Sequence, residues 1–334
     1  MTATIRTRSP MTAPLAKIQG PVRGGLDHVS DEMVRIVLTD TPLIGEVSRH
    51  LLGMKGKMFR PTLVLLSSQV GGGTASRAAT LGAVVELIHL ATLVHDDSVD
   101  HSVLRRGMPT VNALFSHQIS VIMGDFLYSR ALLELVRLKD LDALGVLAKA
   151  SNDMTLGEMR QLALDDPLAF SEEDYNLLIR AKTASLMSAA CEVGALCGAS
   201  DHRAALARYG EAMGMAFQIA DDLLDYTEET ETTGKPTGLD LREHKVTLPL
   251  IAALRTMAAS ARVEVDAFFG ADEPDDVAVA RIMEIVAEEG GLDYARARGD
   301  EHAARAEEAL AAVPASEATD ALRSAISYVM ERHS

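Results

Sequence analysis

The chain has 334 residues, a formal net charge of −16 and no tryptophan, and only 4% of its residues are aromatic. A chain poor in aromatic residues and rich in alanine, leucine and methionine favours helices packed against helices over a sheet-rich core. The acidic balance argues against a nucleic acid partner, because no net cationic face is available to neutralise phosphates. An acidic protein that binds a phosphate ligand needs metal bridges and a local basic pocket instead.

Residues 1–25 are rich in proline and glycine and predict a flexible N-terminal leader. Residues 26–334 are expected to form a single all-α domain, because helical apolar spacing persists and no strand alternation does. We expect Ser171, with Asp174 three residues later, and Asp201 to be helix N-caps. The predicted helical segments lie near 28–52, 59–70, 75–100, 117–138, 140–165, 172–198, 202–226, 246–269, 276–290 and 293–312.

The two cysteines, Cys191 and Cys197, lie six residues apart in a run of small residues. This spacing fits neither a redox pair nor a zinc site and indicates buried thiols in a reducing, cytoplasmic compartment. No apolar run follows Arg6 and Arg8, so no signal peptide is expected. The best apolar candidate, at 186–199, is interrupted by a charge and falls short of the roughly 20 residues that span a membrane. We therefore expect no transmembrane segment.

An Asp-Asp-x-x-Asp pattern occurs twice, each time at the C-terminal end of an apolar, helix-periodic run. On a helix, the first and last aspartates of each copy share one face, with Cβ atoms about 6 Å apart, and repel one another unless a cation satisfies them. Oxygen ligands without a cysteine or histidine cluster select Mg²⁺, with Mn²⁺ as a substitute, and leave positions open for phosphate oxygens. The pattern therefore predicts a multi-ion clamp on a phosphate-rich ligand. The candidate metal ligands are Asp96, Asp97, Asp100, Asp221, Asp222 and Asp225.

Basic and polar residues flank both copies of the pattern. His89 lies two helical turns before Asp96 and shares its face, which favours a binding role over the structural role more usual for a lone histidine. An arginine pair follows the first copy, and bidentate guanidinium groups beside an acidic cluster suit a diphosphate. Gln218 precedes the second copy by one turn and could aim its amide dipole at a reacting centre. The other basic candidates are Lys57, Arg60, Arg105, Arg106, Lys182, Lys235 and Lys245.

The ordered motifs resemble those of the trans-isoprenyl diphosphate synthases, which make farnesyl, geranylgeranyl and longer polyprenyl diphosphates. The resemblance covers roughly residues 30–310. Its motifs are Gly-Lys-x-x-Arg-Pro at 56–61, His-Asp-Asp-x-x-Asp at 95–100, Arg-Arg-Gly-x-Pro-Thr at 105–110, Gly-Asp-Phe-Leu at 124–127, Lys-Thr at 182–183, Phe-Gln-x-x-Asp-Asp-x-x-Asp at 217–225, Gly-Lys-Pro at 234–236 and Lys-Val-Thr-Leu-Pro at 245–249.

This resemblance implies a helical bundle of the isoprenoid-synthase type around a deep central cavity, and a homodimer. It implies that Asp96, Asp100 and Asp221 are the primary Mg²⁺ ligands, with support from Asp97, Asp222 and Asp225. The residues implied for the allylic diphosphate are Arg105, Lys182, Lys235 and Lys245. Those implied for isopentenyl diphosphate are Lys57, Arg60, His89 and Arg106. Thr183 and Gln218 are implied to lie beside the allylic carbon.

The implied reaction is a Mg²⁺-dependent 1′-4 condensation of isopentenyl diphosphate with an allylic diphosphate. Developing charge on the leaving diphosphate is stabilised electrostatically, and an allylic carbocation forms. Thr183, Gln218 and a main-chain carbonyl stabilise that cation by their dipoles, and the proton is lost to the departed diphosphate. No nucleophilic side chain is needed. An apolar product could bring the protein to a membrane surface.

Small side chains before the first aspartate motif predict a long product. Ala91 and Thr92 lie about one turn deeper on the same helix, where short-chain relatives carry aromatic rings that stop elongation. Ile88 and Val85, further down, are also non-aromatic. We expect a product longer than farnesyl and geranylgeranyl diphosphate, with its floor set by a neighbouring helix near 126–138. The alternative is that small residues merely permit close helix packing.

Four other functions share parts of this pattern. A geranylgeranyl or farnesyl diphosphate synthase would share every motif and differ only in product length. A class I terpene cyclase usually replaces the second aspartate motif with a mixed one, which this chain does not. A phosphohydrolase using His89 and His95 leaves the second motif unexplained. A non-catalytic subunit of a heteromeric synthase typically loses one motif, whereas this chain keeps both.

Overall fold

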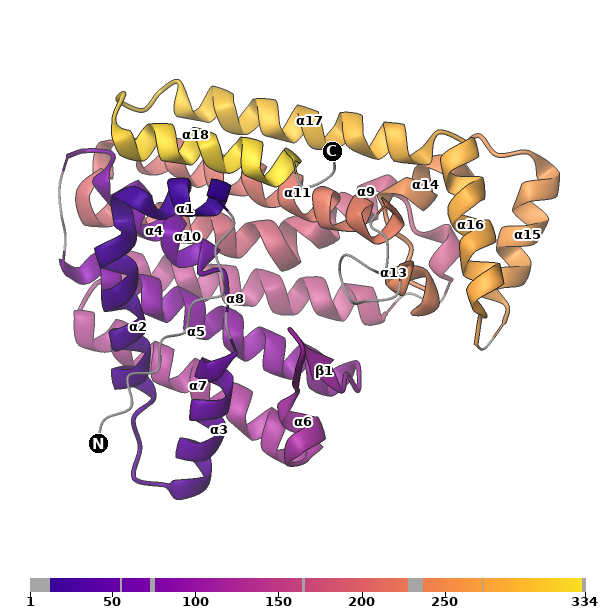
Figure 1. The fold of residues 1–334 in the computed structure, drawn as a ribbon. Coiled ribbons are helices and arrows are strands. Elements are labelled where there is room, and N and C mark those ends of the chain that lie inside the picture. The colour runs from indigo at the N-terminus through magenta and orange to yellow at the C-terminus, as the bar shows by residue number, and fades with distance from the viewer. Residues whose placement is uncertain are drawn as a thin grey trace. The chain divides into compact units, whose positions relative to one another are not determined.

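The computed structural model of the protein describes residues 13–54, 56–72, 76–163, 166–227, 237–271 and 273–331, which are almost entirely helical (Figure 1). The expected all-α fold class is confirmed. The first half contains α1 (Ala13–Gln19), η1 (Gly20–Val22), α2 (Arg23–Val37), α3 (Pro42–Gly53), α4 (Phe59–Gln69), α5 (Ser76–Val99), β1 (Leu104–Arg105), β2 (Met108–Pro109), α6 (Val111–Leu114), α7 (His117–Leu138) and α8 (Leu141–Leu162). The second contains η2 (Pro167–Ala169), α9 (Glu172–Ile179), the π-helical η3 (Arg180–Ala184), α10 (Ser185–Gly198), η4 (Ser200–His202), α11 (Arg203–Thr227), α13 (Leu239–Arg242), α14 (Leu248–Leu254), α15 (Ala259–Phe269), α16 (Asp276–Glu288), α17 (Gly291–Leu310) and α18 (Glu317–Met330).

Packing divides the chain into two compact units, each built from segments far apart in the sequence. The first unit comprises Met1–Ser151, Leu186–Gly210 and Leu310–Ala325. The second comprises Asn152–Ser185, Glu211–Ala309 and Ile326–Ser334. The division does not fall at the boundary expected after residue 25, and the two aspartate motifs belong to different units. The deep central cavity implied by the resemblance stays a prediction.

The prediction of a flexible leader is wrong for residues 13–25. These residues form α1, η1 and the start of α2, and the side chains of Leu15, Ile18 and Val22 are at most 2% exposed. Burial of these apolar groups stabilises the segment against the cost of ordering it, whatever its content of proline and glycine. Residues 1–12 lie outside the described residues.

Several helix boundaries differ from the sequence pattern for identifiable reasons. The segment expected at 28–52 is split into α2 and α3 before Pro42, because the residue before a proline disfavours helical geometry. The segment expected at 246–269 is likewise two helices, α14 and α15. Ser171 and Asp174 form the expected capping box. Asp201 is not an N-cap; it lies within η4, and α11 begins after it.

Helix α5 is the centre of the first unit and packs against α2, α4 and α7. Its residues are apolar on all sides, as expected of a helix that is enclosed by others. By length and composition, α5 is also the one helix among the described residues that could cross a membrane, over Arg77–Val99. This corrects the expectation that the best apolar stretch lies at 186–199. The evidence for a membrane span is weak, because 61% of its most apolar window is buried inside the protein.

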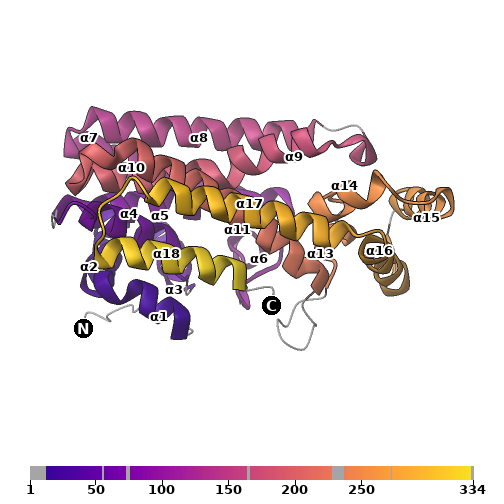
Figure 2. The same ribbon diagram turned by 90° about the horizontal axis from the view of Figure 1, so that it is seen from above.

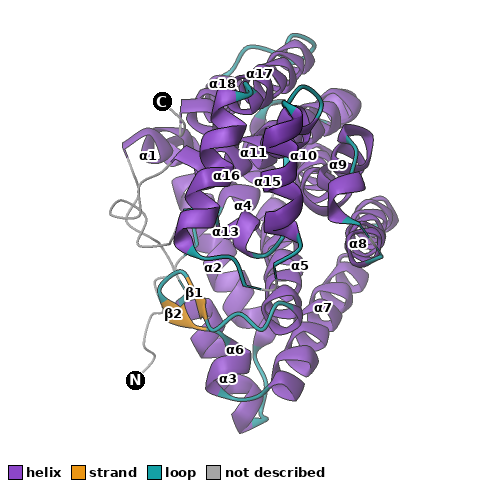
Figure 3. Cartoon of the chain, turned by 90° about the vertical axis from the view of Figure 1, so that its right-hand side faces the viewer, coloured by secondary structure: helices purple, strands orange, loops and turns teal. Residues whose placement is uncertain are grey.

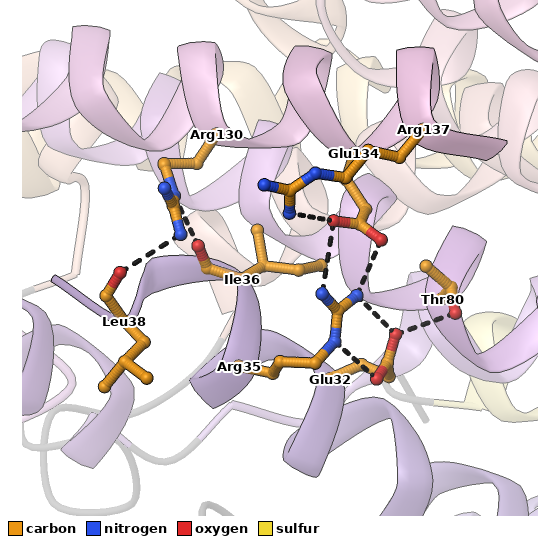
Figure 4. Close-up of polar contacts among 8 residues, drawn as sticks. All are labelled: Glu32, Arg35, Ile36, Leu38, Thr80, Arg130, Glu134 and Arg137. Atoms are coloured by element: carbon orange, nitrogen blue, oxygen red, sulfur yellow. Dashed lines mark hydrogen bonds and ion pairs between the residues drawn. The ribbon is translucent and has the colours of Figure 1, made fainter. Parts of the chain in front are cut away.

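A charged network ties α2 to α5 and α7 on one side of the first unit (Figure 4). Arg35 donates to both oxygens of Glu32 at 2.8 Å and to both oxygens of the buried Glu134, at 2.6 and 3.3 Å. Thr80 of α5 donates to Glu32 at 2.7 Å, and Arg137 donates to Glu134 at 3.2 Å. The buried carboxylate of Glu134 is thus held by two guanidinium groups, which offsets the cost of its burial.

The second unit has an apolar core of its own, centred on α14 and α16. Ile251, Val265, Phe268 and Ile282 are among its buried members. Helices α15 and α16 contact each other and lie side by side in both views (Figures 1 and 2). This core also encloses Tyr175 of α9, whose hydroxyl reaches the second aspartate motif.

The two cysteines agree with the expectation of buried thiols. Cys191 is buried and Cys197 is partly buried, and both are free thiols. Burial raises the pKa of the Cys191 thiol to about 12, so this group is inert at neutral pH.

Candidate active site

The first aspartate motif lies at the C-terminal end of α5 in the first unit. Asp97 is 5% exposed, and Arg105 of β1 holds it: Nε donates to both carboxylate oxygens at 2.8 Å, and Nη2 lies 2.8 Å from Oδ1. Asp96 is partly buried and Asp100 is exposed. Asp97 therefore binds the guanidinium group of Arg105. The resemblance implied that Asp97 supports a bound metal ion. Arg105 binds Asp97 through Nε and Nη2, and its side chain remains 31% exposed.

The arginine pair lies in a small hairpin that the sequence pattern did not indicate (Figure 3). Arg105 pairs with Met108, and the turn residues Arg106 and Gly107 have positive φ angles of 52° and 73°, as a type I′ turn requires. A left-handed conformation costs an arginine roughly 1–2 kcal/mol, so it persists only where its surroundings hold it. The Arg106 guanidinium lies against Gly56, where a Cβ atom would come within 2.7 Å of Nη1. Glycine at position 56 therefore makes room for this arginine.

Several cationic side chains gather around His89. Burial lowers the pKa of His89 well below its ordinary value, and the charges of Arg60, Arg106 and Arg105 lower it further. The imidazole is therefore neutral at pH 7 and sits among guanidinium groups. Lys57 is exposed in the loop that leads into α4. Arg60 and Arg106, expected to bind isopentenyl diphosphate with Lys57 and His89, both act on the pKa of His89, and the assignment of these residues to that substrate stays a prediction.

His95, directly before the first motif, packs on α7. Its Nε2 lies 3.1 Å from the carbonyl oxygen of Val121 and 3.4 Å from Oδ1 of Asp125. A Cβ atom at Gly124 would lie 2.2 Å from that nitrogen. Glycine at position 124 therefore leaves room for the His95 ring in this conformation. The sequence identified the motif at 124–127 but not the contact of Asp125 with His95.

The second aspartate motif, in the second unit, has a different environment. Asp222 is 4% exposed, and its two oxygens accept hydrogen bonds from Tyr175 Oη at 2.5 Å and Gln218 Nε2 at 2.8 Å. Gln218 Oε1 in turn accepts from Thr183 Oγ1 at 2.7 Å. Asp222 is therefore part of a chain of hydrogen bonds, and its expected role as a supporting metal ligand stays a prediction.

This chain of hydrogen bonds fixes the orientation of Gln218. Its amide nitrogen donates to Asp222 and its amide oxygen accepts from Thr183, and the expectation that the amide dipole faces a reacting centre stays a prediction. The hydroxyl proton of Thr183 is directed at Gln218, which leaves the oxygen lone pairs of Thr183 for another contact. Thr183 lies in the π-helical turn η3, a feature that often marks functional sites.

The lysines expected to bind the allylic diphosphate have protein partners in this structure. Lys182 Nζ lies 2.6 Å from Glu158 Oε2, and Lys245 Nζ lies 2.6 Å from Glu243 Oε2. Each pair would have to open for the ammonium group to reach a phosphate. Lys235 lies outside the described residues.

Asp240 is a site residue that sequence reasoning missed. The carboxylate of Asp225 accepts the backbone N–H groups of Leu239 and Asp240, both at 2.9 Å, and so brings Asp240 to the second motif. Burial, and then the charge of Asp225, raises the pKa of Asp240 to about 6. Burial, and then the charge of Asp240, raises the pKa of Asp222 to about 8. No motif spacing pointed to Asp240, which follows Asp225 by 15 residues.

The second motif fits a divalent cation on the chemistry of its donors. Its donors are carboxyl groups, and burial, followed by the charge of a neighbouring aspartate, raises the pKa values of Asp222 and Asp240. Hard oxygen donors of this kind suit Mg²⁺. Within the described ranges, no three histidine, cysteine, aspartate or glutamate side chains already form a metal cage.

The residues predicted to control product length lie along α5. Val85, Ile88 and Ala91 are 0%, 3% and 2% exposed. Thr92 is partly buried, and its hydroxyl donates to the carbonyl oxygen of His89 at 2.8 Å. The role of these four residues in setting product length stays a prediction.

Known proteins resemble the chain over almost its whole length. The profile of the polyprenyl synthetase family matches residues 41–286. A short chain isoprenyl diphosphate synthase from Methanothermobacter thermautotrophicus is 36% identical over 313 residues, which cover 91% of this chain and 96% of that protein. An octaprenyl diphosphate synthase from Haemophilus influenzae is 36% identical over 315 residues, covering 92% and 94%.

Solved structures give the same result. A decaprenyl diphosphate synthase from Rhodobacter capsulatus superposes with a TM-score of 0.91 at 35% identity, covering 96% of this chain and 100% of that one. A polyprenyl synthase from Caulobacter crescentus, in complex with calcium and isoprenyl diphosphate, has a TM-score of 0.90 at 33% identity and covers 98% and 99%. These similarities extend well beyond the aspartate motifs. The chain belongs to the polyprenyl synthetase family and is a trans-prenyltransferase.

Proposed function

We propose that the protein condenses isopentenyl diphosphate with an allylic diphosphate, with Mg²⁺, to make an all-trans polyprenyl diphosphate longer than geranylgeranyl diphosphate. The observation that carries the proposal is the gathering of Arg60, Arg105 and Arg106 around a neutral His89, on the helix that ends in the first aspartate motif. Such a cluster, in a protein with a net charge of −16, is suited to a diphosphate.

The two substrates are assigned to different groups of residues. Lys57, Arg60, His89 and Arg106 bind isopentenyl diphosphate in this proposal. The allylic diphosphate is bound through Arg105, Lys182, Lys235 and Lys245, which requires Lys182 and Lys245 to leave Glu158 and Glu243. The metal ligands are Asp96, Asp100 and Asp221, with Asp225 in support. Mg²⁺, when bound, neutralises the charge that develops on the leaving diphosphate.

The side chains of the second unit position and stabilise the reacting carbon. Tyr175 and Gln218 hold Asp222, and Gln218 holds the hydroxyl of Thr183. With its proton directed at Gln218, Thr183 presents oxygen lone pairs that stabilise an allylic cation by their dipole. The double bond of isopentenyl diphosphate attacks that cation, and the proton released in the final step goes to the departed diphosphate.

A long product is supported by the small side chains on α5 and by the long-chain relatives. Ala91 and Thr92 leave no ring across the path of a growing chain. The octaprenyl and decaprenyl synthases described above are similar to this chain over more than nine tenths of its length. A short chain isoprenyl diphosphate synthase from Methanothermobacter is also 36% identical to this chain, so the product length has to be measured directly.

The test is to incubate the purified protein with Mg²⁺, labelled isopentenyl diphosphate and geranyl, farnesyl or geranylgeranyl diphosphate, and to size the products. We expect chains of more than four isoprene units. Ala91→Phe or Thr92→Phe should shorten them and leave the first condensation intact. A wild-type product that stops at farnesyl or geranylgeranyl diphosphate would contradict the proposed length.

We further propose that two copies of the chain pair through α7. One side of this helix carries large apolar side chains that are 37–62% exposed: Val121, Ile122, Tyr128, Leu132, Leu133 and Val136. A contiguous apolar face of this kind marks an interface, and soluble homo-oligomers are most often two-fold dimers. Light scattering should give twice the chain mass, and a stable monomer at micromolar concentration would reject the dimer. The free thiols support a reducing, cytoplasmic location, and an apolar product favours release at a membrane surface.

A further inference from the structure

The short helix α1, which the sequence predicted to be part of a leader, reaches the loop that carries Lys57. Gln19, its last residue, is 3% exposed. The Gln19 amide nitrogen donates to the carbonyl oxygen of Lys57 at 2.8 Å and to Thr62 Oγ1 at 3.0 Å. Thr62 is fully buried and donates in turn to the carbonyl oxygen of Met58 at 2.7 Å. One buried amide and one buried hydroxyl therefore hold two consecutive carbonyl groups.

These bonds hold a backbone conformation that the chain would otherwise avoid. Met58 has φ of 52° and ψ of 36°, in the left-handed region, directly before α4. A non-glycine residue keeps this conformation only where its surroundings determine it. The carbonyl groups on both sides of the strained residue, those of Lys57 and Met58, are the ones that Gln19 and Thr62 bind. The amide and the hydroxyl thus stabilise the left-handed turn.

The turn at Met58 sets the position of the cationic residues on either side of it. Lys57 precedes Met58, and Arg60 lies in the first turn of the helix that follows. Gly56, one residue earlier, lies against the guanidinium of Arg106. If the turn relaxed, the backbone would carry Lys57 away from Arg60 and change the surface that Arg106 packs on.

We infer that Gln19 is a positioning residue for the isopentenyl diphosphate site, acting through the turn at Met58. This inference rests on the proposed assignment of Lys57 and Arg60 to that substrate. A neutral amide suits the task, because it supplies two donors to two acceptors without adding a negative charge that would pair with the cationic group. The N-terminal helix is then a part of the substrate site and not an appendage.

The test compares KM and kcat for variants that remove this support. Gln19→Met keeps the length of the side chain and removes its donors, and Thr62→Val removes the hydroxyl at constant shape. With farnesyl diphosphate as saturating primer, both should raise KM for isopentenyl diphosphate by about tenfold, while kcat and KM for farnesyl diphosphate stay within about twofold. Thr62→Ser, which keeps the hydroxyl, should restore the wild-type KM.

Ser68→Ala is the matched control. Ser68 is 2% exposed on the same helix α4, and its hydroxyl donates to the carbonyl oxygen of Leu65, away from the turn. Its loss should lower the melting temperature without changing either KM. A second readout is calorimetric binding of isopentenyl diphosphate in EDTA, where Gln19→Met should weaken binding by the same factor.

The outcomes separate this inference from the proposed function. If Lys57→Ala raises KM for isopentenyl diphosphate and both Gln19→Met and Thr62→Val leave it unchanged, the inference is wrong and the proposed function stands. Equal changes in kcat and both KM values would make Gln19 merely structural and would also overturn it. If Lys57→Ala has no effect on this KM, both the assignment of the isopentenyl diphosphate site and the inference about Gln19 are wrong.

Discussion

The two Asp-Asp-x-x-Asp motifs differ in the groups that bind their middle aspartate, which is Asp97 in the first motif and Asp222 in the second. Asp97 and Asp222 are equally buried, at 5% and 4% exposed. Asp97 binds the guanidinium of Arg105, which carries a full positive charge. Asp222 binds the neutral hydroxyl of Tyr175 and the neutral amide of Gln218. The first motif therefore has its middle charge balanced within the protein, and the second does not.

The difference assigns the two motifs different electrostatic tasks. In the first unit, the Asp97–Arg105 pair anchors the hairpin whose turn carries Arg106 to the cationic cluster. In the second unit, burial and then the charges of Asp240 and Asp221 raise the pKa of Asp222 to about 8, so the ionised form of this carboxyl group is disfavoured in the metal-free protein. A bound cation would favour the ionised form. A repeated motif is thus not evidence for a repeated role.

The largest expected effect comes from the outer positions of the motifs, where the comparison predicts similar behaviour. Asp96→Asn and Asp221→Asn each remove a charge and keep the side-chain size, so the fold should persist. Turnover should fall by about 10²–10³ or more, because charge stabilisation of the leaving group is the main catalytic contribution. The check is kcat at saturating Mg²⁺ and substrates, with circular dichroism to verify folding. Near-normal activity in either variant would show that a clamp by both motifs is wrong.

A second prediction separates the units by substrate. Lys57→Ala and Arg60→Ala should raise KM for isopentenyl diphosphate, since each removes a charged contact worth about 2–4 kcal/mol to a bound phosphate. Lys182→Ala should instead raise KM for the allylic diphosphate. Steady-state kinetics with each substrate varied in turn provides the measurement. Equal effects on both KM values would merge the two groups of residues into one basic pocket.

A third prediction concerns the chain of hydrogen bonds in the second unit. Tyr175→Phe keeps the buried ring and removes the bond to Asp222, so Gln218 and Thr183 lose part of their support. We expect kcat to fall about tenfold with little change in either KM, as for the loss of one hydrogen bond to a charged group. Tyr209→Phe is the matched control, because its buried hydroxyl donates to the carbonyl oxygen of Leu322, away from the site. Equal losses in both variants would argue against a role for Tyr175 in turnover.

The smallest predicted effect is a pH dependence of stability that arises from His89. Its pKa is lowered well below 6.5 in the folded protein, chiefly by burial and then by the neighbouring arginines. As the pH falls below 6.5, the unfolded chain binds the proton first, so the free energy of unfolding decreases; above 6.5 this loss is absent. Denaturant unfolding between pH 7.5 and 5 should show a steeper decrease for the wild type than for His89→Asn. Parallel curves would mean that His89 is not shielded from protonation.

Reasoning from sequence succeeded where a residue type and a short spacing determine the result. The helix expected at 117–138 is α7, and the cationic group around His89 follows from the motifs. It failed where the partner is distant in sequence and chemically ordinary. Nothing in the pattern around Gln19 shows that its amide binds a carbonyl 38 residues away. The sequence around Tyr175 likewise indicates only a buried aromatic ring, although its hydroxyl donates to the carboxylate of Asp222, 47 residues later.

The roles of the middle aspartates were also beyond the pattern, for a physical reason. The spacing of Asp-Asp-x-x-Asp places the outer carboxylates on one face of the helix and the middle one about 100° away, towards neighbouring elements. Whether those elements offer a guanidinium or a hydroxyl depends on tertiary structure. The resemblance implied only that Asp97 and Asp222 are supporting ligands, and the structure shows which protein groups bind them.

The most direct test is to compare the stabilities of Asp97→Asn and Asp222→Asn, without metal and in EDTA, by denaturant unfolding at pH 7.5. Asp97→Asn should lower the free energy of unfolding by about 1–3 kcal/mol, because Arg105 loses its counter-charge while about a third exposed. Asp222→Asn should leave the free energy of unfolding unchanged or raise it, because burial of this carboxylate is opposed in the metal-free protein. Equal losses in the two variants, or a larger loss for Asp222→Asn, would contradict the claim that one motif is balanced within the protein and the other awaits a cation.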